Sequence, residues 1–525
     1  MANRMDLVRL LEESAKKFSR RNCLISAGAV YNFRSLNREA NQLSFGLKER
    51  LKVKKGEKVA VLLNNCPEFI VALFAILKAG AVCVPLNVFL SFNELKHILK
   101  DSRSKLLISS SDFLETLQKL SGEKQKGAEG LLNLENIILT DKKVDKFLYW
   151  NQIIVKEQTR NPSFDINPEE LALLIYTSGT TGFPKGVMLS HSNLCSNVLS
   201  SVRALEISPQ DRFLLILPMF HSFTLMVCIL IPLYAGARII ILKSVRPFQK
   251  VLRSILLNRV TIIVGIPQLF DILQNLTLPA ILQMFLRIRL CISGAAPLRL
   301  ETLRAFKEKF KRIPLLEGYG LTEASPVVSL NPLRGIRKPG SIGLPLPGVE
   351  VKVVRGDESE AACGEVGELI VKGPNVMLGY FNRPQESKRA IRGSWLFTGD
   401  MVKIDSDGYI YIVGRKKEMI LIHGMNVYPS EIENVLKNHP KIKEIAVVGK
   451  KDKSKGELPL AFIVLHKDCS ACESEFINYC KGRLANYKIP RLIEFREDLP
   501  KTPTGKVLKR KLIEISSANP QRKER

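Results

Sequence analysis

The chain has 525 residues, of which 46% are hydrophobic, and it carries a formal net charge of +28 at pH 7. A chain of this length exceeds what one simple core supports, so we expect two or three domains, and its apolar content excludes a disordered protein. The charge favours acidic partners: nucleic acid, an anionic membrane surface, a phosphorylated small molecule or an acidic carrier protein.

The N-terminal segment, residues 1–21, has apolar residues at helical spacing among charges. This pattern predicts an ordinary surface helix and argues against a signal peptide. The most apolar segment, residues 223–235, is shorter than the roughly 20 residues of a membrane span and contains Pro232, so we interpret it as a buried helix. The scattered cysteines fit reduced thiols, and we expect a cytoplasmic protein, with peripheral contact to the inner membrane as an open alternative.

From about residue 58, short apolar runs alternate with amphipathic segments, and the same rhythm returns over residues 238–297. This alternation predicts an α/β fold with two helix-covered β-sheets. From about residue 340, short apolar runs between Gly and Pro turns predict a small β-rich subdomain. Beyond Gly414 the pattern predicts a separate α+β domain, with helices over residues 430–439 and 477–487.

A loop rich in glycine and hydroxyl groups, YTSGTTGFPKG, occupies residues 176–186 after an apolar strand-like run. Glycines allow the backbone to approach a ligand, while Thr177, Ser178, Thr180, Thr181 and Lys185 can interact with anionic oxygens. The pattern is not that of a nucleoside-triphosphatase P-loop, because that motif ends in Gly-Lys-Ser/Thr. A phosphate-binding loop is therefore one interpretation, and a plain surface loop is the other.

A second glycine-rich element, EGYGLTEAS, spans residues 317–325. Tyr319 could stack on a base, Thr322 could donate to a phosphate, and Glu323 could hold magnesium, which needs only one or two protein carboxylates. The alternative is a turn that leads into a helix.

Three charged residues complete the candidate site. Asp400 in GSWLFTGD and Arg415 in IVGRKK could together bind the hydroxyls of a ribose. Lys506 stands on a Pro/Gly/Thr loop in LPKTPTGKVLKRKL, free of bulky neighbours, and could be presented to an active site.

Seven motifs occur in one order between residues 176 and 506: YTSGTTGFPKG, LPMFHSF, SGAAP, EGYGLTE, TGD, GRKKEMI and PKTPTGK. In these motifs the chain resembles the adenylate-forming (AMP-binding) superfamily, and the segment MILIHGMNVYPSEIENVL looks most like the bacterial medium/long-chain fatty acyl-CoA synthetases. The resemblance implies a two-step reaction with ATP, Mg²⁺ and coenzyme A. A fatty acid carboxylate attacks the α-phosphate of ATP, pyrophosphate leaves, and a thiol then takes the acyl group from the acyl-AMP.

The resemblance also implies roles for individual residues. The loop from Thr177 to Lys185, with Ser178, Gly179, Thr180, Thr181 and Gly182, would bind the β- and γ-phosphates, and Thr177 with Glu323 would hold the metal. The adenine slot would comprise Gly294, Ala295 and Ala296 with the segment Glu317, Gly318, Tyr319 and Gly320. Thr322 would contact the α-phosphate, Asp400 and Arg415 the ribose, and Lys506 both the carboxylate and the α-phosphate.

The same resemblance implies an N-terminal adenylation domain over residues 1–414 and a mobile C-terminal domain over residues 415–525 that rotates between the two half-reactions. Lys417 would be the hinge, at a position where some members have aspartate, and Gly424 would line the thiol channel. His221 matches the position that lines the carboxyl end of the acyl tunnel. No aspartate follows Phe220, which argues against an amino acid substrate.

Several alternatives stay open at this point. Acyl carrier protein is the second candidate acceptor, because the basic C-terminal segment would attract an acidic partner. An aryl-CoA ligase is a further possibility, and His221 could be a packed core histidine. A basic protein that binds nucleic acid or membrane would be the non-enzymatic alternative, although the segment KVLKRKL lacks the interleaved aromatic residues expected for nucleic acid.

Overall fold

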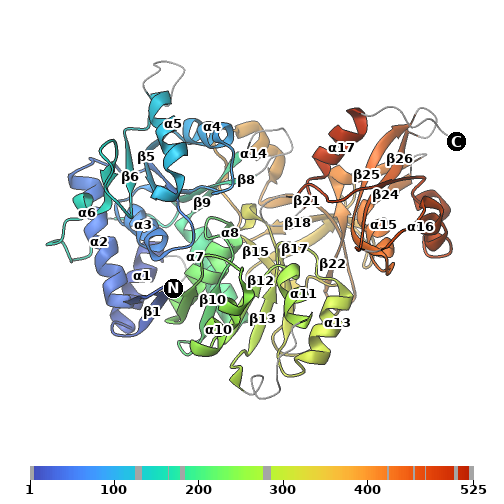
Figure 1. The fold of residues 1–525 in the computed structure, drawn as a ribbon, viewed down its shortest axis with the longest axis horizontal. Coiled ribbons are helices and arrows are strands. Elements are labelled where there is room, and N and C mark those ends of the chain that lie inside the picture. The colour runs from blue at the N-terminus through green and yellow to red at the C-terminus, as the bar shows by residue number, and fades with distance from the viewer. Residues whose placement is uncertain are drawn as a thin grey trace. The chain divides into compact units, whose positions relative to one another are not determined.

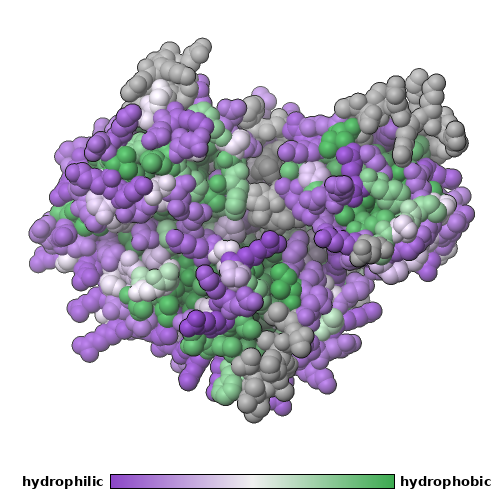
Figure 2. Space-filling model, viewed as in Figure 1, coloured by the Kyte–Doolittle hydropathy of each residue, from purple (hydrophilic) through white to green (hydrophobic). Residues whose placement is uncertain are grey.

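The computed structural model describes residues 5–124, 133–162, 165–177, 184–275, 285–422, 425–452, 456–467, 469–501 and 507–518. The chain divides into two compact units. The first unit comprises Met1–Val351 with Val371–Leu396, and the second comprises Lys352–Ile370 with Phe397–Arg525. The face drawn in Figure 2 is predominantly hydrophilic, with smaller apolar patches among the charged residues.

The first unit contains an eight-stranded sheet in the order β19-β9-β8-β4-β3-β5-β6-β7. Its strands are β3 (Lys58–Leu62), β4 (Val82–Pro85), β5 (Ser104–Ser109), β6 (Asn136–Leu139), β7 (Leu148–Tyr149), β8 (Leu171–Thr177), β9 (Lys185–Ser190) and β19 (Gly379–Tyr380). The strands from β8 to β7 run parallel, and β9 and β19 form an antiparallel edge. Apolar runs without alternation predict such strands, because helices cover both faces of a parallel sheet.

A nine-stranded sheet in the same unit has the order β16-β15-β14-β13-β12-β10-β11-β1-β2. Its strands are β1 (Asn22–Ser26), β2 (Ala29–Asn32), β10 (Arg212–Leu215), β11 (Arg238–Ile241), β12 (Ile262–Gly265), β13 (Leu290–Ser293), β14 (Leu315–Gly320), β15 (Val327–Leu330) and β16 (Leu344–Pro345). The strands from β14 to β1 are parallel, whereas β2, β15 and β16 are antiparallel edges.

Helices pack on both sheets of this unit (Figure 1). They are α1 (Leu7–Lys17), α2 (Phe33–Glu49), α3 (Pro67–Lys78), α4 (Phe92–Ser102), α5 (Leu114–Lys124), α6 (Trp150–Ile153), α7 (His191–Ala204), α8 (Ser222–Thr224), α9 (Ile231–Ala235), α10 (Phe248–Leu257), α11 (Pro267–Asn275), α13 (Leu300–Lys309) and α14 (Pro384–Ala390). Helix α7 contacts β8 and β9 of one sheet and α9 near the other, so helices separate the two sheets.

The N-terminal segment forms α1, as predicted, but this helix is more than a surface element. Asp6 caps it by accepting from the amides of Val8 and Arg9, and one of its faces, including Leu7, Leu10 and Leu11, is buried. Residues 223–235 are largely buried, also as predicted. They form a π-helical segment, η4 (Leu225–Leu230), between the short helices α8 and α9.

A five-stranded sheet contains the points where the chain passes from one unit to the other. Its strands are β17 (Glu350–Val354), β18 (Gly367–Lys372), β20 (Ile391–Arg392), β21 (Trp395–Ile404) and β22 (Ile410–Arg415). This sheet is the small β-rich subdomain expected from residue 340 onwards.

The second unit ends in an α+β region whose sheet has the order β24-β23-β26-β25, with β27 paired to β26. Its elements are β23 (Ile420–Ile422), β24 (Met425–Val427), α15 (Pro429–Leu436), β25 (Ile442–Asp452), β26 (Gly456–Leu465), α16 (Glu473–Cys480), β27 (Leu492–Phe495) and α17 (Lys509–Ala518). The prediction of a helix over residues 477–487 was wrong in its second half. Helix α16 ends at Cys480, because Gly482 adopts a left-handed φ of 73° that an α-helix cannot contain.

Candidate active site

The predicted phosphate loop connects two antiparallel strands. Thr177 ends β8 and is paired across the hairpin with Lys185, the first residue of β9. Because β8 is parallel to β4, this hairpin end lies at the carboxyl edge of the eight-stranded sheet, where α/β proteins generally bind ligands. The predicted contacts Ser178, Gly179, Thr180, Thr181 and Gly182 lie outside the described residues.

The predicted adenine slot lies at the carboxyl ends of two parallel neighbours, β13 and β14, whose residues Ser293 and Glu317 are in register. Gly294, Ala295 and Ala296 directly follow β13, while Gly318, Tyr319 and Gly320 end β14. The two segments therefore leave the sheet at the same edge. The resemblance assigns the binding of adenine to these two segments.

Two of these glycines are required by close packing. A Cβ on Gly294 would lie 2.8 Å from the ring of Phe223, and a Cβ on Gly320 would collide with the carbonyl oxygen of Pro326. Real Cβ atoms essentially never approach so closely, and backbone cannot yield as a flexible side chain can. A side chain at position 294 or 320 would displace the segments that carry the site.

Glu317 is buried beneath this edge and accepts a hydrogen bond from the amide of Leu298 at 2.9 Å. Burial raises the pKa of its carboxyl group to about 7, and the Leu298 amide opposes this effect only in part. Its side chain therefore braces the segment after β13 against β14.

Thr322 and Glu323 follow on a short 3-10 helix, η5 (Thr322–Ala324). The Thr322 hydroxyl lies 3.0 Å from the hydroxyl of Ser222, and the Tyr380 hydroxyl donates to Glu323 Oε1 at 2.9 Å. The structure thus joins three distant segments in one place: the segment after His221, the EGYGLTE element and the β19 strand.

His221 precedes the buried helical segment and uses its Nδ1 to accept a hydrogen bond from the amide of Phe223 at 3.3 Å. Burial lowers the pKa of its imidazole, so the neutral form is favoured. With Nδ1 engaged as an acceptor, the proton resides on Nε2, which leaves one N–H donor. The next residue, Ser222, contacts Thr322, the predicted ligand of the α-phosphate. His221 is therefore adjacent in sequence to a residue that contacts Thr322.

Two residues near the phosphate loop are missing from the motif-based set: Tyr380 and Glu386. Glu386 on α14 forms an ion pair with Lys185, whose Nζ also lies 5.6 Å from the centre of the Tyr380 ring. Tyr380 thereby contacts both the predicted metal ligand Glu323 and the predicted phosphate lysine. The segment GYFNRPQES has no recognisable motif, and nothing in it indicates contact with Lys185, about 200 positions earlier.

The second unit holds the predicted ribose residues. Asp400 on β21 is paired with Arg415 on β22, and Arg415 Nε lies 2.9 Å from Asp400 Oδ1. The Asp400 side chain is 5% exposed and that of Arg415 50% exposed, so the carboxylate is fixed while the guanidinium remains accessible.

Lys417 lies in a 3-10 helix, η6 (Lys416–Glu418), directly after β22. Beside it, Lys509 Nζ lies 2.8 Å from Glu418 Oε2 and 2.9 Å from Glu433 Oε1, and these carboxylates raise the pKa of the Lys509 ammonium against its burial. The predictions for Gly424 and Lys506 fall outside the described residues.

Within the described ranges, no group of three or more His, Cys, Asp or Glu side chains could hold a metal ion. Every helix in those ranges is too short or too polar to cross a bilayer.

Comparison with known proteins identifies the class. Residues 11–381 match the AMP-binding enzyme family and residues 431–506 match the AMP-binding enzyme C-terminal domain. The chain belongs to the AMP-binding enzyme family, which confirms the resemblance seen in the motifs.

Individual relatives cover nearly the whole chain. The chain is 35% identical to a long-chain-fatty-acid--CoA ligase of Escherichia coli O157:H7, over 96% of this chain and 94% of that protein. It is 34% identical to a long-chain-fatty-acid--CoA ligase of Bacillus subtilis (strain 168), over 97% and 94%. Among solved structures, an anthranilate CoA ligase in complex with anthranoyl-AMP is 30% identical, with a TM-score of 0.87 and 98% of each chain covered.

Proposed function

We propose that this protein activates a fatty acid with ATP, releases pyrophosphate and transfers the acyl group from the acyl-AMP to coenzyme A. The observation that carries the proposal is the convergence of Thr322, Ser222 and Gly294 with Glu323 and Tyr380 at the carboxyl edges of the two sheets. The names of the relatives supply the substrate class, since both are long-chain-fatty-acid--CoA ligases.

Adenylation brings a weak nucleophile, a carboxylate, to a polyanion, so the site must align the two and offset negative charge. In our proposal Lys185 and the hydroxyl groups of the loop from Thr177 to Thr181 bind the β- and γ-phosphates. Thr322 donates to the α-phosphate, because its hydroxyl is already oriented by Ser222 at 3.0 Å. Asp400 and Arg415 bind the ribose, and Gly294, Ala295 and Ala296 with Tyr319 receive adenine.

The residues present fit a magnesium ion. Glu323 is a hard oxygen ligand held by the Tyr380 hydroxyl, and Thr177 offers a second oxygen at the end of β8. Magnesium retains several waters and needs only one or two protein carboxylates, so a larger cluster is not required. The ion would offset phosphate charge; Tyr380 would keep the Glu323 carboxylate in one orientation.

In the unliganded site, Glu386 is the ion-pair partner of the predicted phosphate ligand Lys185. Its carboxylate forms an ion pair with the ammonium group of Lys185. The phosphates of ATP would have to displace this carboxylate in order to bind Lys185. We therefore expect Glu386 to compete with ATP for this lysine, so that a partly buried cation stays paired until the nucleotide arrives.

The acyl side rests on His221 and its surroundings. A neutral imidazole with a free Nε2–H can donate to a carboxylate without forming a permanent ion pair, and residues 225–233, which follow shortly after, are buried and apolar. A long alkyl chain fits such surroundings. An aromatic acid would be the substrate of an aryl-CoA ligase, the second candidate, and acyl carrier protein remains the second candidate acceptor.

The C-terminal residues act in sequence in this proposal. Lys506 bridges the carboxylate and the α-phosphate during adenylation. The domain over residues 415–525 then turns about Lys417 relative to the domain over residues 1–414, which places Gly424 at the thiol channel. The short η6 helix at Lys417, directly after β22, supports a pivot here, because pivots commonly lie at the ends of elements.

Replacing Lys417 with proline tests the pivot. Because proline fixes φ near −65°, we expect adenylation to stay within about twofold of the parent rate, while thioester formation falls about tenfold or more. Quench-flow measurement of acyl-AMP and acyl-CoA separates the two steps, and Lys416→Ala is the neighbouring control. Undiminished thioester synthesis by the proline variant would refute the pivot.

A substrate panel tests the function itself. Saturated fatty acids from short to long chain and one aromatic acid are each incubated with ATP and Mg²⁺, and pyrophosphate release is followed before and after addition of coenzyme A or acyl carrier protein. We expect an optimum among the long chains and discharge by coenzyme A. If none of the carboxylic acids causes pyrophosphate release, the proposal is contradicted. If only acyl carrier protein discharges the acyl-AMP, acyl carrier protein and not coenzyme A is the acceptor.

A further inference from the structure

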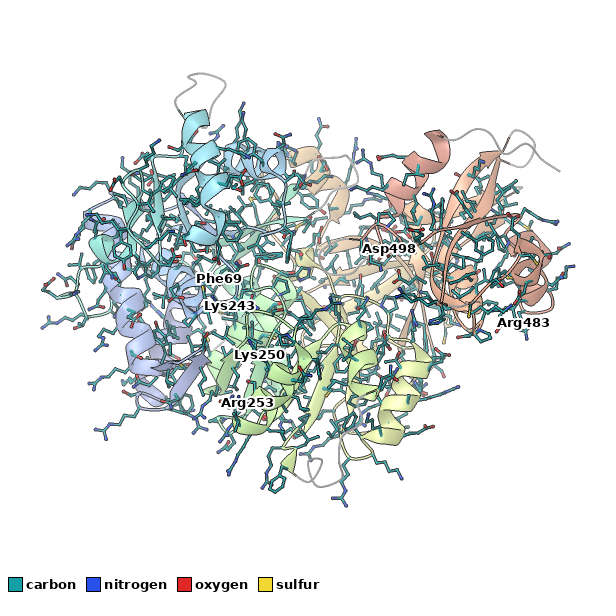
Figure 3. All side chains as sticks on the ribbon, in the orientation of Figure 1. Phe69, Lys243, Lys250, Arg253, Arg483 and Asp498 are labelled. Carbon is teal, nitrogen blue, oxygen red and sulfur yellow. The ribbon has the colours of Figure 1, made fainter. Side chains whose placement is uncertain are left out.

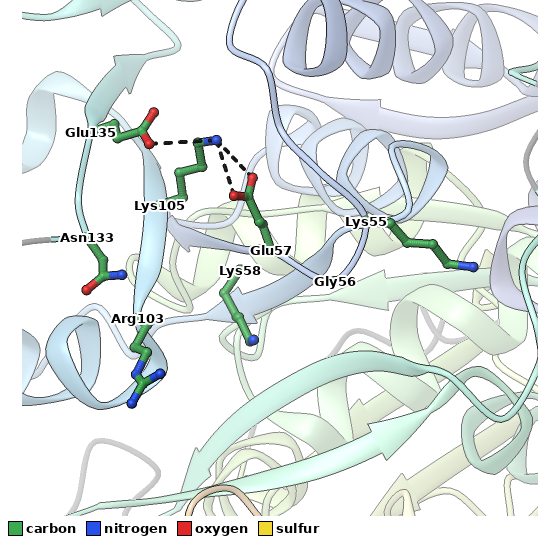
Figure 4. A pocket seen from close by; sticks show the side chains of 8 residues that line it. All are labelled: Lys55, Gly56, Glu57, Lys58, Arg103, Lys105, Asn133 and Glu135. Atoms are coloured by element: carbon green, nitrogen blue, oxygen red, sulfur yellow. Dashed lines mark hydrogen bonds and ion pairs between the residues drawn. The ribbon is translucent and has the colours of Figure 1, made fainter.

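A pocket of about 430 Å³ lies in the first unit, away from the candidate active site (Figure 4). Its lining includes four cationic side chains, Lys55, Lys58, Arg103 and Lys105, and two carboxylates, Glu57 and Glu135. Lys58 begins β3 and Arg103 directly precedes the parallel strand β5, so the pocket lies at the amino edge of the sheet. The phosphate loop leaves β8 at the opposite, carboxyl edge.

Both carboxylates of the pocket are already engaged. Lys105 Nζ lies 3.0 Å from Glu57 Oε2 and 3.7 Å from Glu135 Oε1, and Figure 4 shows these pairs on one side of the pocket. Lys55 is neutralised outside the pocket by Glu170, at 2.7 Å. The two other cations of the lining are Lys58 and Arg103.

Lys58 and Arg103 have no carboxylate partner among the residues that the structure describes. Lys58 Nζ lies 5.3 Å from the ring of Phe381, and in Figure 4 the side chains of Lys58 and Arg103 extend in the same direction, away from Lys105. Burial, followed by the charge of Arg103, lowers the pKa of the Lys58 ammonium, and Glu57 offsets only part of this effect. The pocket thus holds two like charges close together, and neither of them forms an ion pair within the described residues.

We propose that this pocket binds the phosphoryl group of a small phosphorylated anion, with Lys58 and Arg103 as its charged partners. A guanidinium matches two phosphate oxygens in its plane, and an ammonium adds a compact charge. A phosphoryl group bears close to two negative charges at neutral pH and would neutralise both cations, whereas a single carboxylate would neutralise one. Asn133 lies in the same lining and offers an amide to the rest of the ligand.

This site is separate from adenylation and does not depend on the proposed reaction. Its phosphoryl group could come from a free phosphate compound or from a lipid headgroup, and both present the same chemistry to Lys58 and Arg103. Pyrophosphate is the probe for the first source. Vesicles that contain phosphatidic acid, whose headgroup is a phosphomonoester, are the probe for the second source.

The test compares three proteins at about 150 mM salt, where non-specific surface attraction is screened. They are the parent, the double variant Lys58→Gln/Arg103→Gln, and the charge-matched control Lys250→Gln/Arg253→Gln. The control residues are exposed on α10, far along the chain from the pocket (Figure 3). Titration calorimetry with pyrophosphate and sedimentation with vesicles are the two measurements.

For a free phosphate source, we expect the double variant to have one pyrophosphate site fewer than the parent and the control, or at least tenfold weaker binding to that site. For a headgroup source, the double variant alone would lose vesicle binding. Its adenylation rate should stay within about twofold of the parent, because neither residue touches the active site. The charge-conserving pair Lys58→Arg/Arg103→Lys should retain binding if the effect is electrostatic and the fold is intact.

Identical titrations and identical sedimentation in all three proteins would overturn the proposal. An equal loss in the double variant and in the control would overturn it as well, because the binding would then reflect overall charge. A crystal soaked in pyrophosphate gives the location directly: density between Lys58 and Arg103 supports the site, and density only elsewhere contradicts it.

Discussion

The two units hold their candidate site residues in different ways. In the first unit the contacts join residues far apart in sequence, such as Ser222 with Thr322 and Glu323 with Tyr380. In the second unit Asp400 and Arg415 are neighbours on two consecutive strands of one small sheet. Tertiary packing therefore fixes the first set, while the second set depends on local strand pairing.

This difference fits a division of labour. A site that aligns ATP and a fatty acid benefits from groups held in advance by a packed core. The residue that we propose as the pivot, Lys417, stands instead on a short element, the η6 helix, directly after β22.

Lys506→Ala removes the charge that we assign to adenylation alone. We expect acyl-AMP formation to fall by about 10²- to 10³-fold, the usual effect of removing one preorganised charge contact from a transition state. Thioester formation from added acyl-AMP should stay within about twofold. Rapid-quench assays of each half-reaction measure this split, with the nearby exposed Lys511→Ala as the control; equal losses in both steps would contradict the role.

Glu317→Gln tests whether burial in the first unit raises the pKa of the Glu317 carboxyl group. The pKa of Glu317 is raised from 4.5 to about 7, so the stability contributed by its protonated form is complete below pH 4.5 and is lost as the pH rises through about 7. Gln keeps the acceptor for the Leu298 amide and cannot ionise.

Between about pH 5 and pH 8, we therefore expect the free energy of unfolding of the variant to rise by about 2–3 kcal/mol relative to that of the parent. Thermal melts across this range provide the measurement, and Glu49→Gln, an exposed carboxylate on α2, is the control. A difference that does not change with pH would show that Glu317 titrates normally.

Tyr380→Phe removes the hydroxyl that holds Glu323 and leaves the ring beside Lys185. Loss of such a supporting contact commonly weakens a metal site by 10- to 100-fold, so we expect the Mg²⁺ concentration for half-maximal pyrophosphate release to rise about tenfold. Tyr149→Phe is the matched control in the same unit. An unchanged requirement for Mg²⁺ would mean that Tyr380 is only a packing residue.

Glu386→Gln frees Lys185 from its ion pair. Because ATP would no longer displace a carboxylate, the KM for ATP should fall about threefold with kcat nearly unchanged, a change typical of one partly exposed pair. Glu115→Gln, which breaks the exposed pair with Lys119, is the control. A higher KM would instead indicate that Glu386 helps to position Lys185 for the nucleotide.

Much of the fold follows from the sequence because parallel strands covered by helices leave an unmistakable pattern. The apolar runs at residues 58–65 and 105–110 correspond to β3 and β5, and the segment after residue 340 forms short strands, as predicted. The error at α16 has a simple cause. Helical spacing of apolar residues continues past Cys480, but Gly482 takes a left-handed conformation that ends the helix.

The nucleotide motifs are local, so the sequence contains them whole, and family membership is confirmed. The contacts of Glu386 and Tyr380 could not be predicted in this way. Their partners, Lys185 and Glu323, lie on other strands, and a single sequence records no distances between strands. The individual roles of the motif residues stay predictions until the experiments above are done.

In the proposed reaction, a carboxylate oxygen attacks the α-phosphorus of ATP. The most direct test supplies a long-chain fatty acid labelled with ¹⁸O in its carboxyl group, together with ATP, Mg²⁺ and coenzyme A, and analyses the nucleotide product by mass spectrometry. We predict AMP that carries one ¹⁸O atom, with unlabelled pyrophosphate. Label in an inorganic phosphate accompanied by ADP, or AMP without label, would contradict adenylation as the chemistry of this site.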